Sequence, residues 1–154
     1  MADDAIDEVD QAILHALQED ARNISSGDIA ERTGTSGSTV RKRIQRLESD
    51  EVIKGYSAEI DYQKSGYPLR MLLFCTAPIP VRGEQIPDIL DIDGVVSVQE
   101  LVTGERNLLV TVVGETDSDI TTVAQELLDL DLTVVDEVLV RSHETTLFGE
   151  FESE

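Results

Sequence analysis

The sequence predicts an α+β fold made of two small domains, and three observations support this prediction. Apolar residues recur at helical spacing over residues 5–47, whereas after residue 69 they form the short continuous runs typical of buried strands. Turn-forming residues without an apolar period (DYQKSGYP, 61–68) separate the two regions. A length of 154 residues suits one ordinary domain or two small ones. We therefore predict a first domain over residues 1–60, a linker over 61–68 and a second domain over 69–154.

The first domain has the pattern of a winged helix-turn-helix. Residues 5–20 form an amphipathic stripe with acidic residues at its start. Residues 25–47 (SSGDIAERTGTSGSTVRKRIQRL) predict two further helices with Gly34 at the turn between them. On the second of these, Val40, Ile44 and Leu47 fall within about 60° of one another and form the inner side. The β-branched residues around Gly55 predict two short strands, the wing.

The second domain alternates strands and helices in a regular order. We predict strands at 69–77, 95–102, 108–113 and 132–147, and helices at 83–92 and 117–130. The order strand–helix–strand–strand–helix–strand is that of the ferredoxin-like βαββαβ unit. Because a four-stranded sheet with helices on one side leaves its other face uncovered, we expect a homodimer built through this domain.

The outer side of the last helix in the first domain carries the side chains that suit nucleic acid. Hydroxyl, amide and cationic groups reach base edges and phosphates in a major groove. Eight of the twelve Lys and Arg residues fall within residues 1–64, and four of them crowd into 41–46. So local a basic cluster in so acidic a chain indicates an anionic partner, double-stranded DNA. The candidate DNA-binding residues are Ser38, Thr39, Arg41, Lys42, Arg43, Gln45, Arg46 and Lys54.

Composition excludes several other classes of protein. The 32 acidic and 12 basic residues give a net charge of −20, yet 40% of residues are hydrophobic with clear periodicity, which argues against intrinsic disorder. Such acidity is typical of proteins from a salt-loving cytoplasm. The single cysteine, Cys75, lies in an apolar run and suits a buried position. No stretch reaches the roughly 18 apolar residues of a membrane span, and the acidic N-terminus is unlike a secretory leader, so we expect a cytoplasmic protein.

A longer set of positions matches one family of regulators in register. These are Ile6, Asp7, Asp10, Ile13, Leu14, Leu17, Ala21, Arg22, Ile29, Ala30, Ser36, Ser38, Val40, Arg43, Ile44, Arg46, Leu47, Glu48, Val52, Ile53, Gly55, Tyr56, Thr103 and Gly104. With them the chain resembles the leucine-responsive/asparagine-synthetase regulator (Lrp/AsnC) family, the feast/famine regulators, from about residue 6 to 147. The resemblance implies a DNA-binding winged helix, a hinge strand and a ferredoxin-like effector-binding domain. It also implies dimers that often assemble into octamers.

The same resemblance implies a small effector, typically an amino acid, bound near the turn after the second strand of the second domain. The candidate effector-binding residues are Thr103, Gly104, Glu105, Arg106 and Asn107. Family members commonly carry Asp where this chain has Asn107, so we expect Glu105 to supply the charge partner of an α-ammonium and Arg106 to pair with a carboxylate. The family usually has Gly where this chain has Glu51. A plain hairpin turn with polar tips is the alternative for this segment.

Two other functions compete with an effector-controlled regulator. Subunits of siroheme decarboxylases look similar to this family, and Arg141 and His143, placed on one face of the last predicted strand, are the residues such an enzyme would use. An assembly protein that binds DNA without any effector is the other alternative. The sequence shows no nucleophile triad, no His/Cys cluster at metal-ligand spacing and no phosphate-cradling Gly loop. We therefore expect neither catalysis nor a cofactor or metal.

Overall fold

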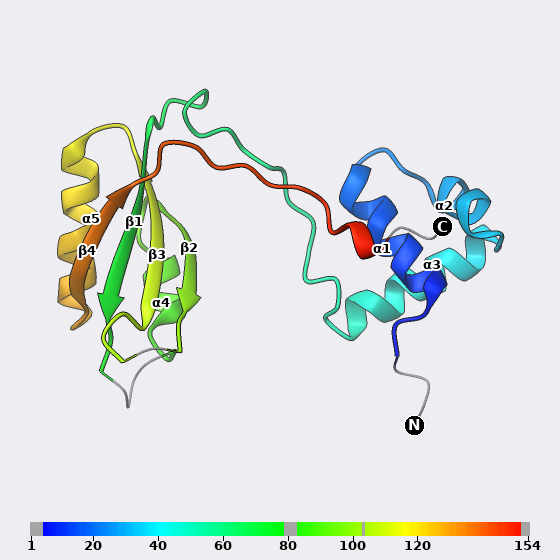
Figure 1. Cartoon of the computed structure of the whole chain (residues 1–154), viewed down its shortest axis with the longest axis horizontal. Coiled ribbons are helices and arrows are strands. Elements are labelled where there is room, and N and C mark those ends of the chain that lie inside the picture. Colours follow the sequence, from blue (N-terminus) through cyan, green and yellow to red (C-terminus); the bar gives the residue numbers. More distant parts are fainter. Residues whose placement is uncertain (1–4, 79–82, 103, 152–154) are drawn as a thin grey trace. The chain divides into compact units, whose positions relative to one another are not determined.

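The computed structural model describes residues 5–78, 83–102 and 104–151, which divide into two compact units (Figure 1). One unit comprises residues 1–58 together with 144–154, and the other comprises residues 59–143. The final residues therefore belong with the N-terminal helices and not with the second domain, to which the sequence prediction gave everything up to 154. None of the helices in the described parts of the chain has the length and apolar character that crossing a membrane requires.

Three helices make up the N-terminal unit: α1 (Glu8–Asp20), α2 (Ser26–Thr33) and α3 (Gly37–Ser49). Each begins at a side chain that accepts a hydrogen bond from the first turn: Asp7, Ser25 and Ser36 respectively. Helix α2 ends at Gly34, whose φ of 68° is left-handed and lets the chain turn sharply into α3. The helix-turn-helix therefore follows from local sequence signals.

The three helices share one small apolar core. Ile13 of α1, Ile29 of α2, and Val40 and Leu47 of α3 are all at most 1% exposed. Partly buried apolar residues pack around them: Ile6, Val9, Leu14, Leu17, Ile24, Ile44 and Ile53. The inner side predicted for the third helix is therefore the side that is observed.

The wing predicted around Gly55 is not formed as a hairpin in this chain. Residues 52–60 are all described, and none of them is in a strand. The backbone N–H groups of Val52 and Ile53 donate instead to the Leu47 carbonyl, at 2.9 and 3.0 Å. These bonds close the end of α3, so the segment that would start the first wing strand finishes a helix, and the residues after it find no ladder partner.

The second unit contains a four-stranded antiparallel sheet with strand order β2-β3-β1-β4 (Figure 1). Its elements are β1 (Leu69–Thr76), α4 (Ile86–Leu90), β2 (Val95–Glu100), β3 (Leu108–Gly114), α5 (Asp117–Asp129) and β4 (Thr133–Leu139). Central strands β1 and β3 pair from Leu69↔Gly114 to Cys75↔Leu108. The ferredoxin-like order predicted from the sequence is confirmed.

The last strand is shorter than the prediction over 132–147. Strand β4 lies at the sheet edge and pairs only with β1, from Thr76↔Thr133 to Met71↔Leu139. One further bond, from Val140 N–H to the Arg70 carbonyl, ends the contact. The length of β1 therefore limits β4, and Arg141 and His143 lie beyond it, outside any strand.

Both helices of this unit cover the same face of the sheet. Ile89 of α4 and Leu127 of α5 pack in one buried cluster with Leu73, Val110 and Val112. Because side chains alternate along a strand, the neighbours of these residues point to the other face. That open face is partly exposed and includes Leu72, Phe74, Leu109 and Val138.

The C-terminal segment returns to the N-terminal unit. Its backbone N–H at Phe148 donates to Gln18 Oε1 of α1 at 3.3 Å. A short 3-10 helix, η2 (Gly149–Phe151), follows, and the Phe148 and Phe151 rings meet edge to face with centroids 4.7 Å apart. A backbone hydrogen bond therefore joins this segment to α1, and the two aromatic rings pack against each other within the segment.

Candidate nucleic-acid interface

Helix α3 presents a polar, cationic side to solvent. Ser38, Arg41, Lys42 and Gln45 are all exposed, while Val40 and Leu47 on the opposite side are buried. Among the described residues, neither Arg41 nor Lys42 makes an ion pair. Their charges and the Gln45 amide are therefore available to a partner outside the chain.

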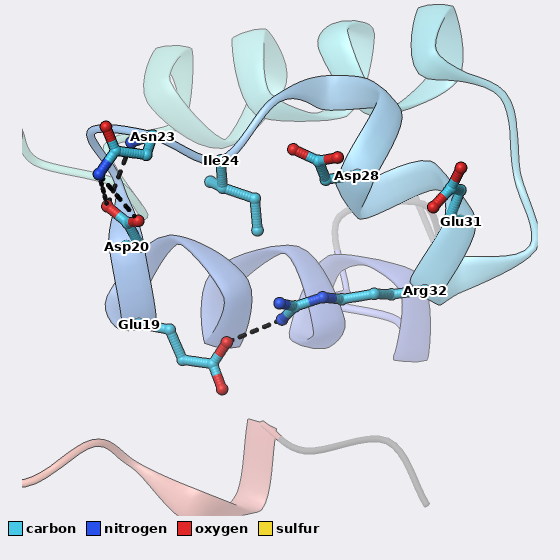
Figure 2. Close-up of a pocket in the computed structure, with 7 residues that line it drawn as sticks. All are labelled: Glu19, Asp20, Asn23, Ile24, Asp28, Glu31 and Arg32. Atoms are coloured by element: carbon cyan, nitrogen blue, oxygen red, sulfur yellow. Dashed lines mark hydrogen bonds and ion pairs between the residues drawn. The ribbon is translucent and has the colours of Figure 1, made fainter.

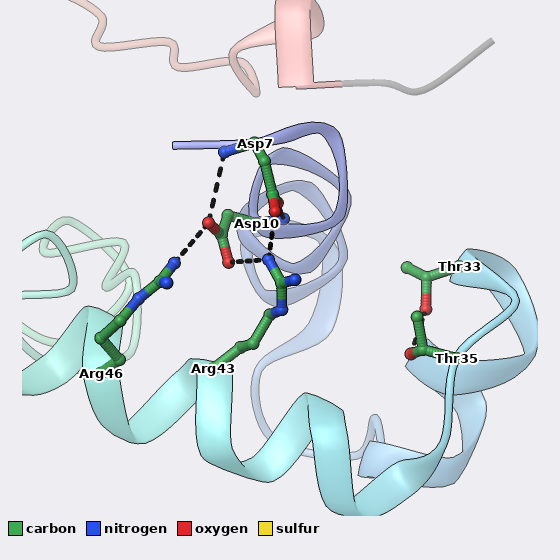
Figure 3. Close-up of polar contacts among 6 residues, drawn as sticks. All are labelled: Asp7, Asp10, Thr33, Thr35, Arg43 and Arg46. Carbon is green, nitrogen blue, oxygen red and sulfur yellow. Dashed lines mark hydrogen bonds and ion pairs between the residues drawn. The ribbon is translucent and has the colours of Figure 1, made fainter. Parts of the chain in front are cut away.

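Two of the arginines predicted to contact DNA lie differently, because helix α1 binds them (Figure 3). Arg43 Nη1 donates to Asp7 Oδ2 at 2.5 Å and to Asp10 Oδ1 at 3.2 Å. Arg46 Nη2 donates to the other Asp10 oxygen, Oδ2, at 2.5 Å. These guanidinium groups join α3 to the first turn of α1. Carboxylates of the same chain hold Arg43 and Arg46 in this structure, and the assignment of these two residues to DNA stays a prediction.

The charged groups of Asp7, Asp10, Arg43 and Arg46 form one cluster in which opposite charges are in direct contact. Hydrogen bonding to Arg43 is the largest effect that lowers the pKa of the Asp7 carboxyl from 3.8 to about 2. Bonding to Asp7 in turn raises the pKa of the Arg43 guanidinium. Asp10 is fully buried, and a buried carboxylate is stable only when cations and donors surround it. The sequence pattern therefore places opposite charges where the two helices meet.

The hydroxyl groups near the start of α3 are partly engaged within the helix. Ser36 Oγ accepts from the Thr39 N–H at 3.2 Å and lies 3.0 Å from Ser38 Oγ and 2.9 Å from Thr39 Oγ1. Thr39 is half-buried, so its hydroxyl serves the cap. Ser38 and Lys54 are exposed. Of the candidate hydroxyls, Ser38 is therefore the one that lies on the outer side.

A hollow of about 510 Å³ lies on the same unit but has the wrong charge for nucleic acid (Figure 2). It is lined by Glu19, Asp20, Asn23, Ile24, Asp28, Glu31 and Arg32. Its one cation, Arg32, bonds Glu19 at 2.7 Å, so negative charge dominates the lining. Anionic DNA is repelled here, which leaves the outer side of α3 as the candidate interface. The described residues contain no His, Cys, Asp and Glu cluster that could hold a metal ion.

The predicted effector turn has one buried residue, Asn107. Its Nδ2 donates to the Ala77 carbonyl at 2.9 Å, and its Oδ1 accepts from the Ala77 N–H at 2.7 Å. The side chain thus bonds Ala77 as a paired strand would, and it is only 1% exposed. Both polar ends of the amide are used inside the protein in this structure, and an effector contact at Asn107 stays a prediction.

The other residues of this turn lie at the surface. Gly104, Glu105 and Arg106 are exposed, while Thr103 lies outside the described residues. Arg106 Nη2 lies 3.3 Å from Asp136 Oδ2 of β4, and its Cζ stands 5.4 Å from the centroid of the Phe74 ring. The guanidinium is therefore held over the open face of the sheet, with half of the side chain accessible.

Sequence reasoning assigned no site role to Asp7, Asp10 or Ala77. The two aspartates stood only among the positions that match the family pattern. An i, i+3 pair of carboxylates facing an i, i+3 pair of arginines in another helix is a signal that could have suggested the contact. For Ala77 the sequence holds no such signal, because its partner is 30 residues away.

A helix-turn-helix with a cationic outer helix, joined to a ferredoxin-like unit, defines a DNA-binding regulator. The family model described as "winged helix-turn-helix DNA-binding" matches residues 6–54. The chain is 36% identical over 107 residues to an HTH-type transcriptional regulator of Pyrococcus horikoshii, a match that spans 70% of this chain and 66% of that regulator, just under two thirds. It is 32% identical over 109 residues to the regulator LrpA of Mycobacterium tuberculosis, covering 71% of this chain and 72% of LrpA.

Solved structures agree over nearly the whole chain. The feast or famine regulatory protein of M. tuberculosis, solved in complex with L-methionine, superposes with a TM-score of 0.78 at 25% identity, covering 92% of this chain and 96% of that one. The chain belongs to the Lrp family of transcriptional regulators, the feast/famine regulators. Its relatives are transcriptional regulators and not enzymes, so the decarboxylase alternative is set aside.

Proposed function

We propose that this regulator binds a specific DNA site through the outer side of α3. The observation that carries the proposal is the exposure of Ser38, Arg41, Lys42 and Gln45 on the last helix of the helix-turn-helix. Lys42 and Gln45 lie one turn apart and suit base edges, while Arg41 suits the phosphate backbone. Lys54, exposed beyond the helix, adds a phosphate contact in this proposal. Two copies would read two half-sites about one helical turn apart.

Substitution of the outer side tests this proposal. A good contact to a base edge contributes about 1–3 kcal/mol, so Lys42→Ala combined with Gln45→Ala should weaken binding to a selected duplex at least tenfold. Lys64→Ala is the control, because it removes one exposed cation in the linker region. Fluorescence anisotropy at fixed salt measures both. Wild-type affinity in the double variant would exclude α3 as the recognition element.

The salt concentration determines over what distance these cations attract DNA. Binding to DNA weakens by about 0.9 in log K per phosphate contact for each tenfold rise in salt. In the salt-loving environment that the acidic composition indicates, screening acts within about 3 Å at 1 M, so cations act only at contact distance. Direct contacts from α3 to bases therefore carry more of the affinity in this proposal. A cytoplasmic location remains a prediction from the sequence.

For the effector we propose an amino acid bound at the turn that contains Glu105 and Arg106. Support comes from the relative that was solved with L-methionine and from the exposed carboxylate and guanidinium on this turn. Arg106 would exchange Asp136 for the ligand carboxylate, and Glu105 would accept from the ammonium. Because coupling between two sites is reciprocal, DNA would change amino-acid affinity by the same factor as the amino acid changes DNA affinity.

A thermal-shift series with the twenty amino acids tests the effector proposal. A ligand at 100 times its Kd stabilises the folded state by about 2.7 kcal/mol, a shift of several degrees for a unit of this size. Arg106→Gln should remove the shift, while Arg141→Gln, a control outside the turn, should keep it. A chain that binds DNA but responds to none of the twenty would be the effector-independent assembly protein.

We also propose that a second copy covers the open face of the sheet. Leu72, Phe74 and Val138 form an apolar surface there, on the side of the sheet opposite α4 and α5. Sedimentation should show a dimer, and dimers would assemble further, to an octamer in the form typical of the family. Phe74→Glu should shift the protein toward monomer, and an unchanged sedimentation coefficient would contradict this arrangement.

A further inference from the structure

Four cations crowd into residues 41–46, but only two of them are free to meet DNA. Arg41 and Lys42 are exposed without an ion pair among the described residues, whereas Arg43 and Arg46 are bound by α1. We propose that Asp10, assisted by Asp7, is a positioning residue that withholds Arg43 and Arg46 from DNA phosphates and thereby limits non-specific binding. The proposal rests on the proposed function, DNA binding through α3.

The geometry supports a specific restraint on these arginines. One carboxylate, that of Asp10, bonds both guanidinium groups through its two different oxygens, and it is fully buried. Asp7 takes the other bond from Arg43 Nη1 and is held by its own hydrogen bond to the Asp10 N–H at 2.8 Å. Figure 3 shows both arginines reaching from α3 toward these two aspartates. Charge-assisted bonds of this kind are among the stronger ones in proteins.

The side chains of Arg43 and Arg46 are nonetheless partly exposed, so a DNA phosphate could compete with the aspartates for them. Their side chains are 28% and 41% exposed, for Arg43 and Arg46 respectively. On the helix, Arg46 lies about 40° from Lys42, at the margin of the outer side. A freed Arg46 could therefore rotate toward a DNA backbone that Lys42 already approaches. Held by Asp10, it adds charge near the interface without making that contact.

The consequence concerns the affinity for DNA of any sequence. Phosphate contacts carry no sequence information, but each adds about 0.9 to the dependence of log K on log salt. With two arginines per copy withheld, binding to any DNA loses those contacts equally. The restraint therefore lowers the affinity for unrelated DNA, while contacts to base edges still set the preference for the correct site.

The test compares Asp10→Asn with a matched control, Glu8→Gln. Both remove one negative charge from the first turn of α1, but Glu8 is exposed and has no partner among the described residues. The probes are a duplex selected by the wild-type chain from a randomised pool and a shuffled duplex of equal composition. For Asp10→Asn we expect the salt slope to steepen by about 0.9 per newly contacted phosphate and the affinities for both duplexes to rise several-fold, while their ratio stays near the wild-type value. Glu8→Gln should leave the slope as in the wild type.

A variant that also removes the arginines separates this effect from a general loss of structure. In Asp10→Asn combined with Arg43→Gln and Arg46→Gln, the slope should return to the wild-type value, because no freed cation remains. A steeper slope that persists in the combined variant would overturn the proposal. So would an unchanged slope in folded Asp10→Asn.

If Asp10→Asn does not fold, Asp7→Asn decides the matter. Asp7 is half exposed, and Asn caps a helix about as well as Asp, so this variant keeps α1 intact while it weakens the hold on Arg43. A wild-type slope in Asp7→Asn would then overturn the proposal. Failure of the proposed function looks different: the Lys42 and Gln45 double variant would bind the selected duplex as tightly as the wild type.

Discussion

Removal of the Asn107 amide should destabilise the second unit markedly, because it leaves the two backbone groups of Ala77 without partners. The amide bonds both the N–H and the carbonyl of Ala77, and both residues are 1% exposed. Each buried polar group that loses its partner costs about 1–3 kcal/mol, so Asn107→Ala, which orphans two such groups, should lower the free energy of unfolding by about 2–6 kcal/mol. Gln125→Ala, which removes an exposed amide bonded to Asp129, should cost less than about 0.5 kcal/mol.

Urea unfolding monitored by circular dichroism measures both variants. A cost below about 0.5 kcal/mol for Asn107→Ala would refute the reasoning, since it would mean that the Ala77 groups are satisfied in some other way. Asn107→Asp is a second test of the contact with Ala77. A carboxylate oxygen would face the Ala77 carbonyl, so this change should cost more at pH 7 than at pH 3, where the protonated acid can donate. An effector contact at Asn107 would instead change amino-acid binding and leave the unfolding free energy unaltered.

Three further predictions follow from local features. Glu51 has a left-handed φ of 56° after α3, so Glu51→Gly should stabilise the protein by about 0.5–1 kcal/mol in urea unfolding. Ser49→Gly, at the last residue of α3, should instead destabilise it, and equal effects of the two changes would contradict this prediction. NMR titration should give the Asp7 carboxyl a pKa of about 2, and in Arg43→Gln this pKa should return toward 3.8. Because the pKa is lowered in the folded state, the ionised carboxylate stabilises the fold above pH 3.8, and this stabilisation is lost as the pH falls through 2. Burial raises the pKa of the Cys75 thiol to about 11, so a thiol reagent at pH 8 should react with it only as fast as the protein unfolds. Fast labelling of the folded protein would refute the burial of this side chain.

Much of the fold could be predicted because its signals are local. The caps at Ser25 and Ser36, the turn at Gly34 and the apolar positions of α3 each act within a few residues of themselves. The strand order of the second unit followed from runs of apolar residues in the same way. Even the departure at Glu51 keeps the usual helix end, since the Val52 N–H still bonds the Leu47 carbonyl across the left-handed residue.

Where the prediction was wrong, the missing information was a distant partner. The predicted wing is not in a strand within the described chain, because the Val52 and Ile53 N–H groups bond the Leu47 carbonyl instead. The end of β4 depends on where β1 begins, and the place of residues 144–151 depends on a contact with Gln18 of α1. A local pattern carries none of these contacts.

By itself the sequence determined which side of α3 faces inward and that the second unit alternates strands and helices, because apolar spacing acts along one segment. Only the tertiary structure decided that Arg43 and Arg46 form hydrogen bonds with the aspartates of α1 and that the Asn107 amide bonds Ala77. A charged or amide side chain bonds whichever opposite group the fold brings within about 3 Å, and that group lies some 30 residues away in each case.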